Sequence, residues 1–174
     1  MLEVTADIHI SATREEIFPY VADLSRRLTF LDHYVDEYRL TRPRSDGVGA
    51  GVRYRVDAPL FTHYAETTII EVDPPRRLVE EGRAGRQGKI RTGTRWDFGR
   101  EGSKLTRVVL LTWMDGGTPR EQFKQRLGLR RWLRRQAKTS LERLRLIVEE
   151  PTGEPLRRAT IAGLEPEKAA RWGG

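Results

Sequence analysis

The fold is decided by residues 104–149, KLTRVVLLTWMDGGTPREQFKQRLGLRRWLRRQAKTSLERLRLIVE, where a strand pattern changes to a helix pattern at one break. Residues 104–114 form a candidate strand, and the Asp-Gly-Gly sequence that follows is typical of a chain break between elements. Thr118 can cap a helix with Pro119 at its first position, and apolar side chains then recur near the helical period as far as Glu149. The pattern predicts one long helix directly after a strand.

The chain before this break begins with a strand and a short helix. Residues 3–10 alternate between apolar and polar side chains, as a half-buried strand does. Ser11 or Thr13 can cap the helix that follows, because their hydroxyl groups accept hydrogen bonds from free backbone N–H groups. A second short helix or a turn is expected from Ser25 to Leu31.

The sequence pattern in the middle of the chain predicts a series of β-hairpins. Turn signals rich in glycine, proline and aspartate separate short alternating stretches, so neighbouring strands should be antiparallel. The candidate strands cover residues 34–42, 50–57, 63–72, 76–83, 89–99 and 104–114. A twisted sheet followed by one long helix packs most simply with the sheet curled around the helix and space left between them. We therefore expect an α+β fold with a ligand pocket.

The layout and several local motifs resemble the START-like (SRPBCC) superfamily, whose helix-grip fold is also called Bet v 1-like. The similarity is strongest to its bacterial polyketide cyclase/dehydrase branch, and it spans residues 1 to about 149. The motifs that carry it are ISATREEIF at 10–18, GVGAG at 47–51, EVDPPRRL at 71–78, TRWDF at 94–98 and LTRV at 105–108.

This resemblance implies a curved antiparallel seven-stranded sheet around a long C-terminal helix, with two short helices after the first strand. It also implies a lipid, quinone, polyketide or other apolar molecule held between sheet and helix, and for some members cyclisation or dehydration. No catalytic signature of the family carries over residue by residue. We expect the domain to cover residues 1–149 and residues 150–174, rich in proline and glycine, to form a flexible tail.

The amino-acid composition limits which catalytic groups and metal ligands the protein can use. The 174 residues suit one domain, and the absence of cysteine excludes disulfides, thiolate catalysis and cysteine metal sites. His9, His33 and His63 are scattered without metal-ligand spacing, so neither a metal nor a cofactor is predicted. The first residues lack a signal-peptide pattern, and no apolar run approaches the roughly 20 residues that span a bilayer. The protein is expected to be cytoplasmic.

Strand alternation predicts which side chains face the helix. On residues 34–40 and 64–72 it places the even-numbered side chains inside, including Asp36 and Glu66. A carboxyl group in an apolar cavity has a raised pKa and can act as a general acid or base, so both residues are candidate catalytic groups. Two alternatives stay open, namely an ion pair at the cavity rim and a strand register shifted by one residue.

The same alternation and the helical pattern give a set of candidate ligand contacts. They are predominantly aromatic and are expected on the inner wall of the sheet and on the facing side of the helix. The set is Tyr38, Tyr54, Tyr64, Glu66, Trp96, Phe98, Phe123 and Leu127.

The long helix is also strongly basic. Residues 119–149 carry the whole formal net charge of the chain, +7. Arg130, Arg131, Arg134 and Arg135 form a continuous positive stripe that could contact the phosphates of nucleic acid or of an anionic membrane. The alternative is an ordinary solvated face.

The outer face of one predicted strand suggests a contact with a second copy of the chain or with the tail. On residues 104–114 the predicted outer face still holds Val109, Leu111 and Trp113, which is apolar for a surface in water. A homodimer contact or cover by the tail would explain it.

The leading functional prediction is the binding of a hydrophobic or aromatic small molecule between sheet and helix. The first alternative is a cyclase or dehydratase that uses Asp36 or Glu66, and the second is nucleic-acid or membrane binding through the basic helix. A cavity of roughly 300 Å³ or more would favour the first two of these over the third.

Overall fold

The computed structural model describes residues 1–58, 61–116, 128–150 and 160–161. The strands are β1 (Leu2–Ile10), β2 (Val35–Leu40), β3 (Gly51–Ala58), β4 (Phe61–Asp73), β5 (Arg77–Ala84), β6 (Ile90–Gly102), β7 (Leu105–Gly116) and β8 (Thr160–Ile161). The helices are α1 (Arg14–Ala22), α2 (Leu28–Leu31) and α4 (Arg130–Glu149), with short 3₁₀ turns η1 (Leu24–Arg26) and η2 (Arg86–Gly88).

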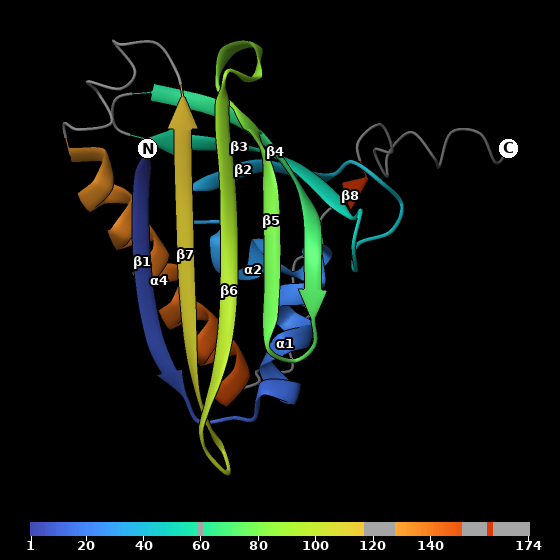
Figure 1. The fold of residues 1–174 in the computed structure, drawn as a ribbon, viewed down its shortest axis with the longest axis vertical. Helices are drawn as coiled ribbons and strands as arrows, with labels where there is room; N and C mark the ends of the chain where they lie inside the picture. Colours follow the sequence, from blue (N-terminus) through green and yellow to red (C-terminus); the bar gives the residue numbers. More distant parts are fainter. Residues whose placement is uncertain (59–60, 117–127, 151–159, 162–174) are drawn as a thin grey trace, which may run out of the picture.

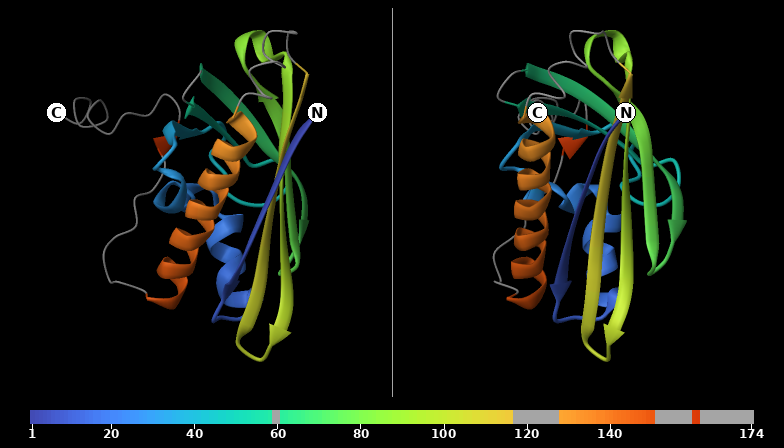
Figure 2. Two further views of the ribbon diagram at one scale, coloured as in Figure 1. Left: turned by 90° about the vertical axis from the view of Figure 1, so that its left-hand side faces the viewer. Right: turned by 60° about the vertical axis from the view of Figure 1, so that its left-hand side comes forward.

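The strands form a single sheet in the order β1-β7-β6-β5-β4-β3-β2-β8. Strands β1 to β7 pair antiparallel, and β8 pairs parallel with the end of β2. The sheet curls, and α4 lies across its concave side together with α1 and α2 (Figures 1 and 2). The predicted α+β helix-grip fold, with seven antiparallel strands around a C-terminal helix, is confirmed.

Helix α4 contributes the centre of the core on its inner side. Ala137, Leu141 and Leu144 are buried and join the cluster formed by the inner faces of the strands and of α1. The predicted helix began at Pro119, but residues 117–127 lie outside the described residues. The described part of the helix follows the predicted apolar period, because only one of its faces meets the sheet.

A capping box fixes the start of α1. The backbone N–H of Thr13 donates to the Glu16 carboxylate at 2.7 Å, and the Glu16 N–H donates to the Thr13 hydroxyl at 3.3 Å. Of the two caps that the sequence allows, Thr13 is therefore the one used. The cap sets the direction in which the chain leaves β1.

Two irregularities in the sheet change which side chains face inward. The β2–β3 register shifts between Asp36 and Arg39, where Glu37 has a φ of 50°, and the β4–β5 register shifts between Ile69 and Glu71. A bulge adds one residue to a strand and moves all later side chains to the opposite face. On β4 the side chains that are buried before the bulge are therefore the odd-numbered Ala65, Thr67 and Ile69.

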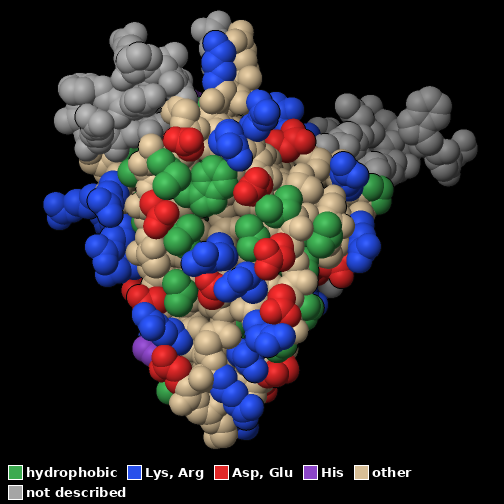
Figure 3. Space-filling model, in the orientation of Figure 1, with side chains coloured by type: hydrophobic (Ala, Val, Ile, Leu, Met, Phe, Trp, Pro, Cys, Tyr) green, Lys and Arg blue, Asp and Glu red, His purple; other side chains and the backbone are tan. Residues whose placement is uncertain are grey.

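The outer face of the sheet mixes apolar and charged side chains (Figure 3). Val109, Leu111 and Trp113 lie there as predicted and are half-buried. The Trp113 ring covers Gly93, where an added Cβ would lie 2.5 Å from it, and Arg91 lies 6.0 Å from the ring centre. Neighbouring strands thus shield part of this apolar face, and the homodimer contact stays a prediction.

Within the described part of the chain, every helix is too short or too polar to cross a membrane.

Gly82 provides a test of the packing of β4 against β5. A Cβ at this position would lie 1.8 Å from the Glu66 carbonyl oxygen and 2.7 Å from the Thr67 Cα, and backbone atoms cannot move away cheaply. We expect Gly82→Ala to lower the free energy of unfolding by about 2 kcal/mol, as overpacking does. Gly99→Ala is the matched control, because its Cβ would make only an ordinary contact, 3.7 Å from the Arg107 carbonyl oxygen. Denaturant unfolding that gives the same stability for both variants would contradict this account.

Candidate functional site

A cavity of about 100 Å³ lies between the concave side of the sheet and α4. Its walls come from strands β2 to β7, from α4 and from the segment around α2. Representative lining residues from the sheet are Tyr38, Tyr54, Thr92, Trp96 and Met114. Trp132 and Leu133 of α4 and Leu129, the residue just before this helix, also line the cavity. Most of this surface is apolar, as expected for a small-molecule site.

Aromatic rings build much of the wall. Tyr38 stacks on Tyr54 with ring centres 6.0 Å apart, and Tyr34 meets Trp132 edge-on at the same distance. Trp96 is held edge-on by Phe30 at 6.2 Å. Because each ring is fixed by another, the cavity has a defined shape in the absence of any ligand.

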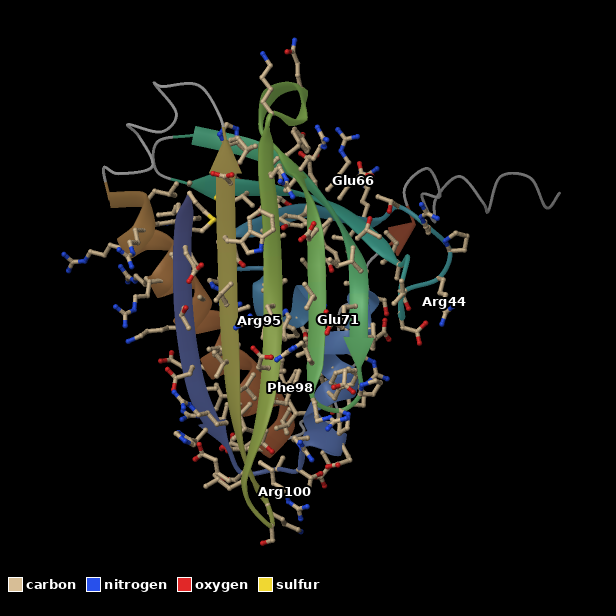
Figure 4. All side chains as sticks on the ribbon, in the orientation of Figure 1. Arg44, Glu66, Glu71, Arg95, Phe98 and Arg100 are labelled. Atoms are coloured by element: carbon tan, nitrogen blue, oxygen red, sulfur yellow. The ribbon has the colours of Figure 1, made fainter. Side chains whose placement is uncertain are left out.

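Three of the predicted ligand contacts, Tyr38, Tyr54 and Trp96, line this cavity. Phe98 is buried beyond it, where its ring packs edge-on against Phe18 at 5.4 Å (Figure 4). Phe123 and Leu127 lie outside the described residues. Whether the three lining residues contact a ligand stays a prediction.

The predicted inward orientation is wrong for Tyr64 and Glu66. Both side chains are exposed, because the inner face before the bulge belongs to the odd-numbered residues. Figure 4 shows Glu66 on the outer side of the sheet. Two adjacent isoleucines, Ile69 and Ile70, make either parity of this strand look apolar. The sequence signal was therefore ambiguous at this strand.

The predicted inward orientation is also wrong for Asp36. Its side chain is 64% exposed, and Arg55 donates to it at 2.6 Å and to Asp57 at 3.2 Å. Arg55 also pairs with Glu37, which accepts a hydrogen bond from the Tyr64 hydroxyl at 2.9 Å. Asp36 thus belongs to a surface ion-pair network, and the apolar surroundings on which its proposed catalytic role depended are absent around it.

The charged groups that do line the cavity are Arg27 and Glu80, which the sequence reasoning missed. Arg27 Nη1 donates to Glu80 Oε1 at 2.5 Å, and both side chains are only 5% exposed. Arg27 Nε also donates to the Val21 carbonyl oxygen at 2.7 Å, and Glu80 accepts from the Thr67 hydroxyl at 3.3 Å. Glu80 shares its strand parity with the fully buried Leu78, a signal that could have found it. Arg27 lies in a turn and gave no such signal.

Electrostatics keep the polar groups of the cavity in defined protonation states. Burial is the largest influence on the pKa of the Arg27 guanidinium and lowers it, but the charge and hydrogen bond of Glu80, together with Tyr38 and Tyr54, raise the pKa more in sum, so the pKa is raised overall. Burial raises the pKa of Tyr34 to about 12, and it raises the pKa values of Tyr38 and Tyr54 further above the ordinary range. At neutral pH the guanidinium is charged and all three hydroxyl groups carry their protons.

Three buried polar atoms that belong to residues lining this cavity have no hydrogen-bond partner among the described residues. They are Arg27 Nη2, the Tyr38 hydroxyl and Trp96 Nε1. An unsatisfied buried polar group costs free energy, so such a concentration in one place is unusual in a folded domain. The packing around the cavity thus leaves some hydrogen-bonding capacity unused.

The arginine stripe, defined here as Arg130, Arg131, Arg134 and Arg135, is exposed on the first turns of α4. None of its members makes an ion pair with another described residue. Further along the same helix, Arg143 pairs with Asp32, and Arg145 lies 4.0 Å from the Glu149 carboxylate. Among the described residues, the positive charge of α4 is thus paired near the end of the helix and unpaired near its start.

No group of three or more histidine, aspartate or glutamate side chains in the described ranges is placed to hold a metal ion.

The curled sheet, the long helix and the cavity between them define a helix-grip domain. Residues 1–149 match the family model described as "Polyketide cyclase / dehydrase and lipid transport". The chain belongs to this family. Comparison with curated protein sequences finds no match.

Solved structures share the fold at low sequence identity. A protein from Thermus thermophilus is 21% identical with a TM-score of 0.70, and the alignment covers 86% of this chain and 99% of that chain. The Zhui aromatase/cyclase from Streptomyces sp. R1128 is 14% identical with a TM-score of 0.69, over 84% and 93% of the two chains. A START superfamily protein from Mycobacterium smegmatis is 12% identical with a TM-score of 0.62, over 87% and 100%. At these identities the likeness extends to the fold alone.

The buried pair gives a prediction about stability. Arg27→Met alone should lower the free energy of unfolding by about 3–5 kcal/mol, because it leaves the Glu80 charge buried without a partner. The double variant Arg27→Met, Glu80→Leu should recover most of that loss, since it removes both charges. Denaturant unfolding of the variants measures this coupling.

The control is the exposed pair of Arg95 and Asp97, whose charged atoms lie 2.8 Å apart. Arg95→Met should change stability by at most about 1 kcal/mol, as is usual for surface ion pairs. Equal losses for Arg27→Met and Arg95→Met would show that the buried pair has no special role.

Proposed function

We propose that the protein binds a hydrophobic or aromatic small molecule in the cavity between the sheet and α4. The observation that carries this proposal is the aromatic wall, in which Tyr38, Tyr54 and Trp96 line one cavity. Membership of a polyketide cyclase/dehydrase and lipid-transport family supports the same class of ligand.

The size of the cavity restricts the ligand. At about 100 Å³ the cavity falls short of the roughly 300 Å³ that would by itself favour a ligand site over binding through the basic helix, so the volume does not decide between them. It approaches the ~150 Å³ that accommodates benzene in an engineered cavity. The cavity therefore suits one small ring or a short chain end. A larger ligand would place only its compact end there.

An enzymatic function as a cyclase or dehydratase finds no support from Asp36 and Glu66, since both are exposed on the outer side of the sheet. The carboxylate that the cavity does contain, Glu80, is held by Arg27 and Thr67. A binding role is the function that these contacts favour.

A cavity-filling variant tests this proposal. Ala137 lines the cavity from α4, so Ala137→Leu places three additional carbon atoms inside it. Native mass spectrometry of gently purified protein should show a defined extra mass for the wild type and none for this variant. Methylcyclopentane, added as an apolar probe, should shift the methyl NMR signals of the wild type alone.

Glu142→Leu is the matched control, because it adds a leucine at an exposed position of the same helix. It should retain both the extra mass and the response to methylcyclopentane. A wild type that carries no extra mass and does not respond to the probe would contradict the proposed function.

A second function, adsorption to an anionic membrane, is favoured by the arginine stripe. Pairs such as Arg130 with Arg134 stand four residues apart, where like charges repel on a helix. Anionic headgroups would relieve this repulsion, at roughly 1 kcal/mol for each arginine near the surface. On the same turns Leu129 and Trp132 line the cavity, so a membrane on the stripe would lie beside the ligand site.

Charge reversal tests this second function. Changing all four stripe residues to glutamate should weaken binding to phosphatidylserine-containing vesicles at least hundredfold in co-sedimentation, and wild-type binding should fall steeply as salt is raised. The matched control makes the same charge change at Arg42, Lys89, Arg100 and Lys104, which are exposed elsewhere. Equal binding to purely zwitterionic vesicles, or equal loss in the control, would contradict it. Binding to duplex DNA without binding to vesicles would assign the stripe to nucleic acid instead.

A further inference from the structure

Three consecutive residues after α2 each contact a different residue of α4. The contacts are the ion pair of Asp32 with Arg143, the His33 Nε2 atom 3.3 Å from the Gln136 carbonyl oxygen, and the edge-on rings of Tyr34 and Trp132, 6.0 Å apart. The partners on α4 are spaced four and seven residues apart, so they lie on one face of the helix. We call this set of three contacts the α2–α4 seam.

The seam joins two walls of the cavity. Leu31 and Tyr34 line the cavity from the segment around α2, and Trp132, Gln136 and Ala137 line it from α4. The residues that make the seam are thus the neighbours of those that enclose the cavity, or the same residues. Separation of the two walls at the seam would open the cavity to water along this side.

Only one of the three contacts contains a group that ordinarily titrates near neutral pH. The carboxylate of Asp32 and the guanidinium of Arg143 belong to residue types that titrate far from it, and their partly exposed pair contributes little stability. The Tyr34 hydroxyl keeps its proton, because burial raises its pKa to about 12. His33 is therefore the contact through which pH can act on the seam.

The hydrogen bond of His33 specifies the neutral form of the ring. The Gln136 carbonyl oxygen can only accept, so Nε2 of His33 carries the proton. The other ring nitrogen, Nδ1, is buried and has no hydrogen-bond partner among the described residues. Protonation would bury a charged N–H group that this arrangement leaves without a hydrogen bond, which is costly. The closed seam therefore fits neutral His33 better than the protonated form.

The surrounding charges act in the same direction overall. Burial has the largest effect on the pKa of His33 and lowers it, and the Arg143 guanidinium lowers it further. The Gln136 and Phe30 carbonyl groups and the Asp32 carboxylate raise the pKa, but it remains lowered overall. With the seam open the pKa of the ring takes its ordinary value of about 6.5. The closed seam is thus fully stable above about pH 6.5 and loses stability as the pH falls below that value.

We propose that His33 is a pH-sensitive latch between the segment around α2 and α4. When it is neutral, it donates to the Gln136 carbonyl oxygen and keeps the cavity closed along the seam. When it is protonated, it favours the separated walls, in which both ring nitrogen atoms reach water. Acidification thereby shortens the time for which the cavity retains a bound molecule. This last step rests on the proposed function, whereas the latch itself requires no ligand.

Amide hydrogen exchange of the full chain without ligand tests the latch, because protection factors report the ratio of closed to open states. The amide groups of Tyr34 and Ala137 report on the two sides of the seam, and that of Val108 in β7 reports on the sheet. Between about pH 7.5 and about pH 5.5, we expect protection at the seam, corrected for intrinsic exchange, to fall severalfold and at most about tenfold. Protection of Val108 should stay within about twofold, since the sheet does not open with the seam.

Substitutions of the histidine separate its titration from its packing. His33→Gln keeps a side-chain N–H that can donate to the Gln136 carbonyl oxygen, so seam protection should match the wild type at the higher pH and should not fall on acidification. His33→Phe keeps a ring without nitrogen atoms, and it should lower protection equally at both pH values. His9→Gln is the matched control, because His9 is exposed and its Nε2 lies 2.8 Å from the Glu101 carboxylate. It should retain the wild-type response.

The outcomes separate the latch from the proposed function. Equal seam protection of the wild type at both pH values, or a pH response that survives in His33→Gln, would overturn the latch. Methylcyclopentane should dissociate faster from the wild type at the lower pH and at one rate from His33→Gln. Equal rates for the wild type, together with the exchange response, would remove the regulation of the cavity and leave the latch. If the probe binds at neither pH, the proposed function fails, while the exchange results still decide the latch.

Discussion

The ion pair between Arg27 and Glu80 is the interaction on which the interior depends. It joins the helical segment after β1 to the middle of the sheet, and both charges are almost completely removed from water. Such a pair contributes little net stability against an apolar replacement, yet breaking it by removing one partner is costly. It therefore fixes the position of the segment around α2 against the sheet, and with it one end of the cavity.

The same pair places two charged groups in the wall of a cavity that is otherwise mostly apolar. Arg27 uses Nε and Nη1 for contacts within the protein, and its Nη2 is buried without a partner among the described residues. Stacked and edge-on rings around them keep the wall rigid. A rigid apolar wall with a few oriented donors is how small-molecule sites combine affinity with selectivity.

Helix α4 has two different faces in the same turns. Leu129, Trp132 and Leu133 line the cavity, while the arginine stripe is exposed to solvent. Trp132 is held edge-on by Tyr34, so it serves the wall of the cavity and is not available as an anchor on the charged side. The helix thus closes the ligand site and presents positive charge next to it.

The sequence by itself determined the order of elements, the antiparallel sheet, the apolar period of α4 and the positive stripe, because these follow from local periodicity and turn residues. It also placed Trp96 and Tyr54 on the inner face, where β6 and β3 alternate regularly. Only the tertiary structure decided the orientation of Asp36 and Glu66, since the bulges in β2 and β4 reverse the parity of the flanking residues. It alone also brought Arg27 to Glu80, 53 residues apart, because a turn residue acquires a buried partner only when the chain folds back onto the sheet.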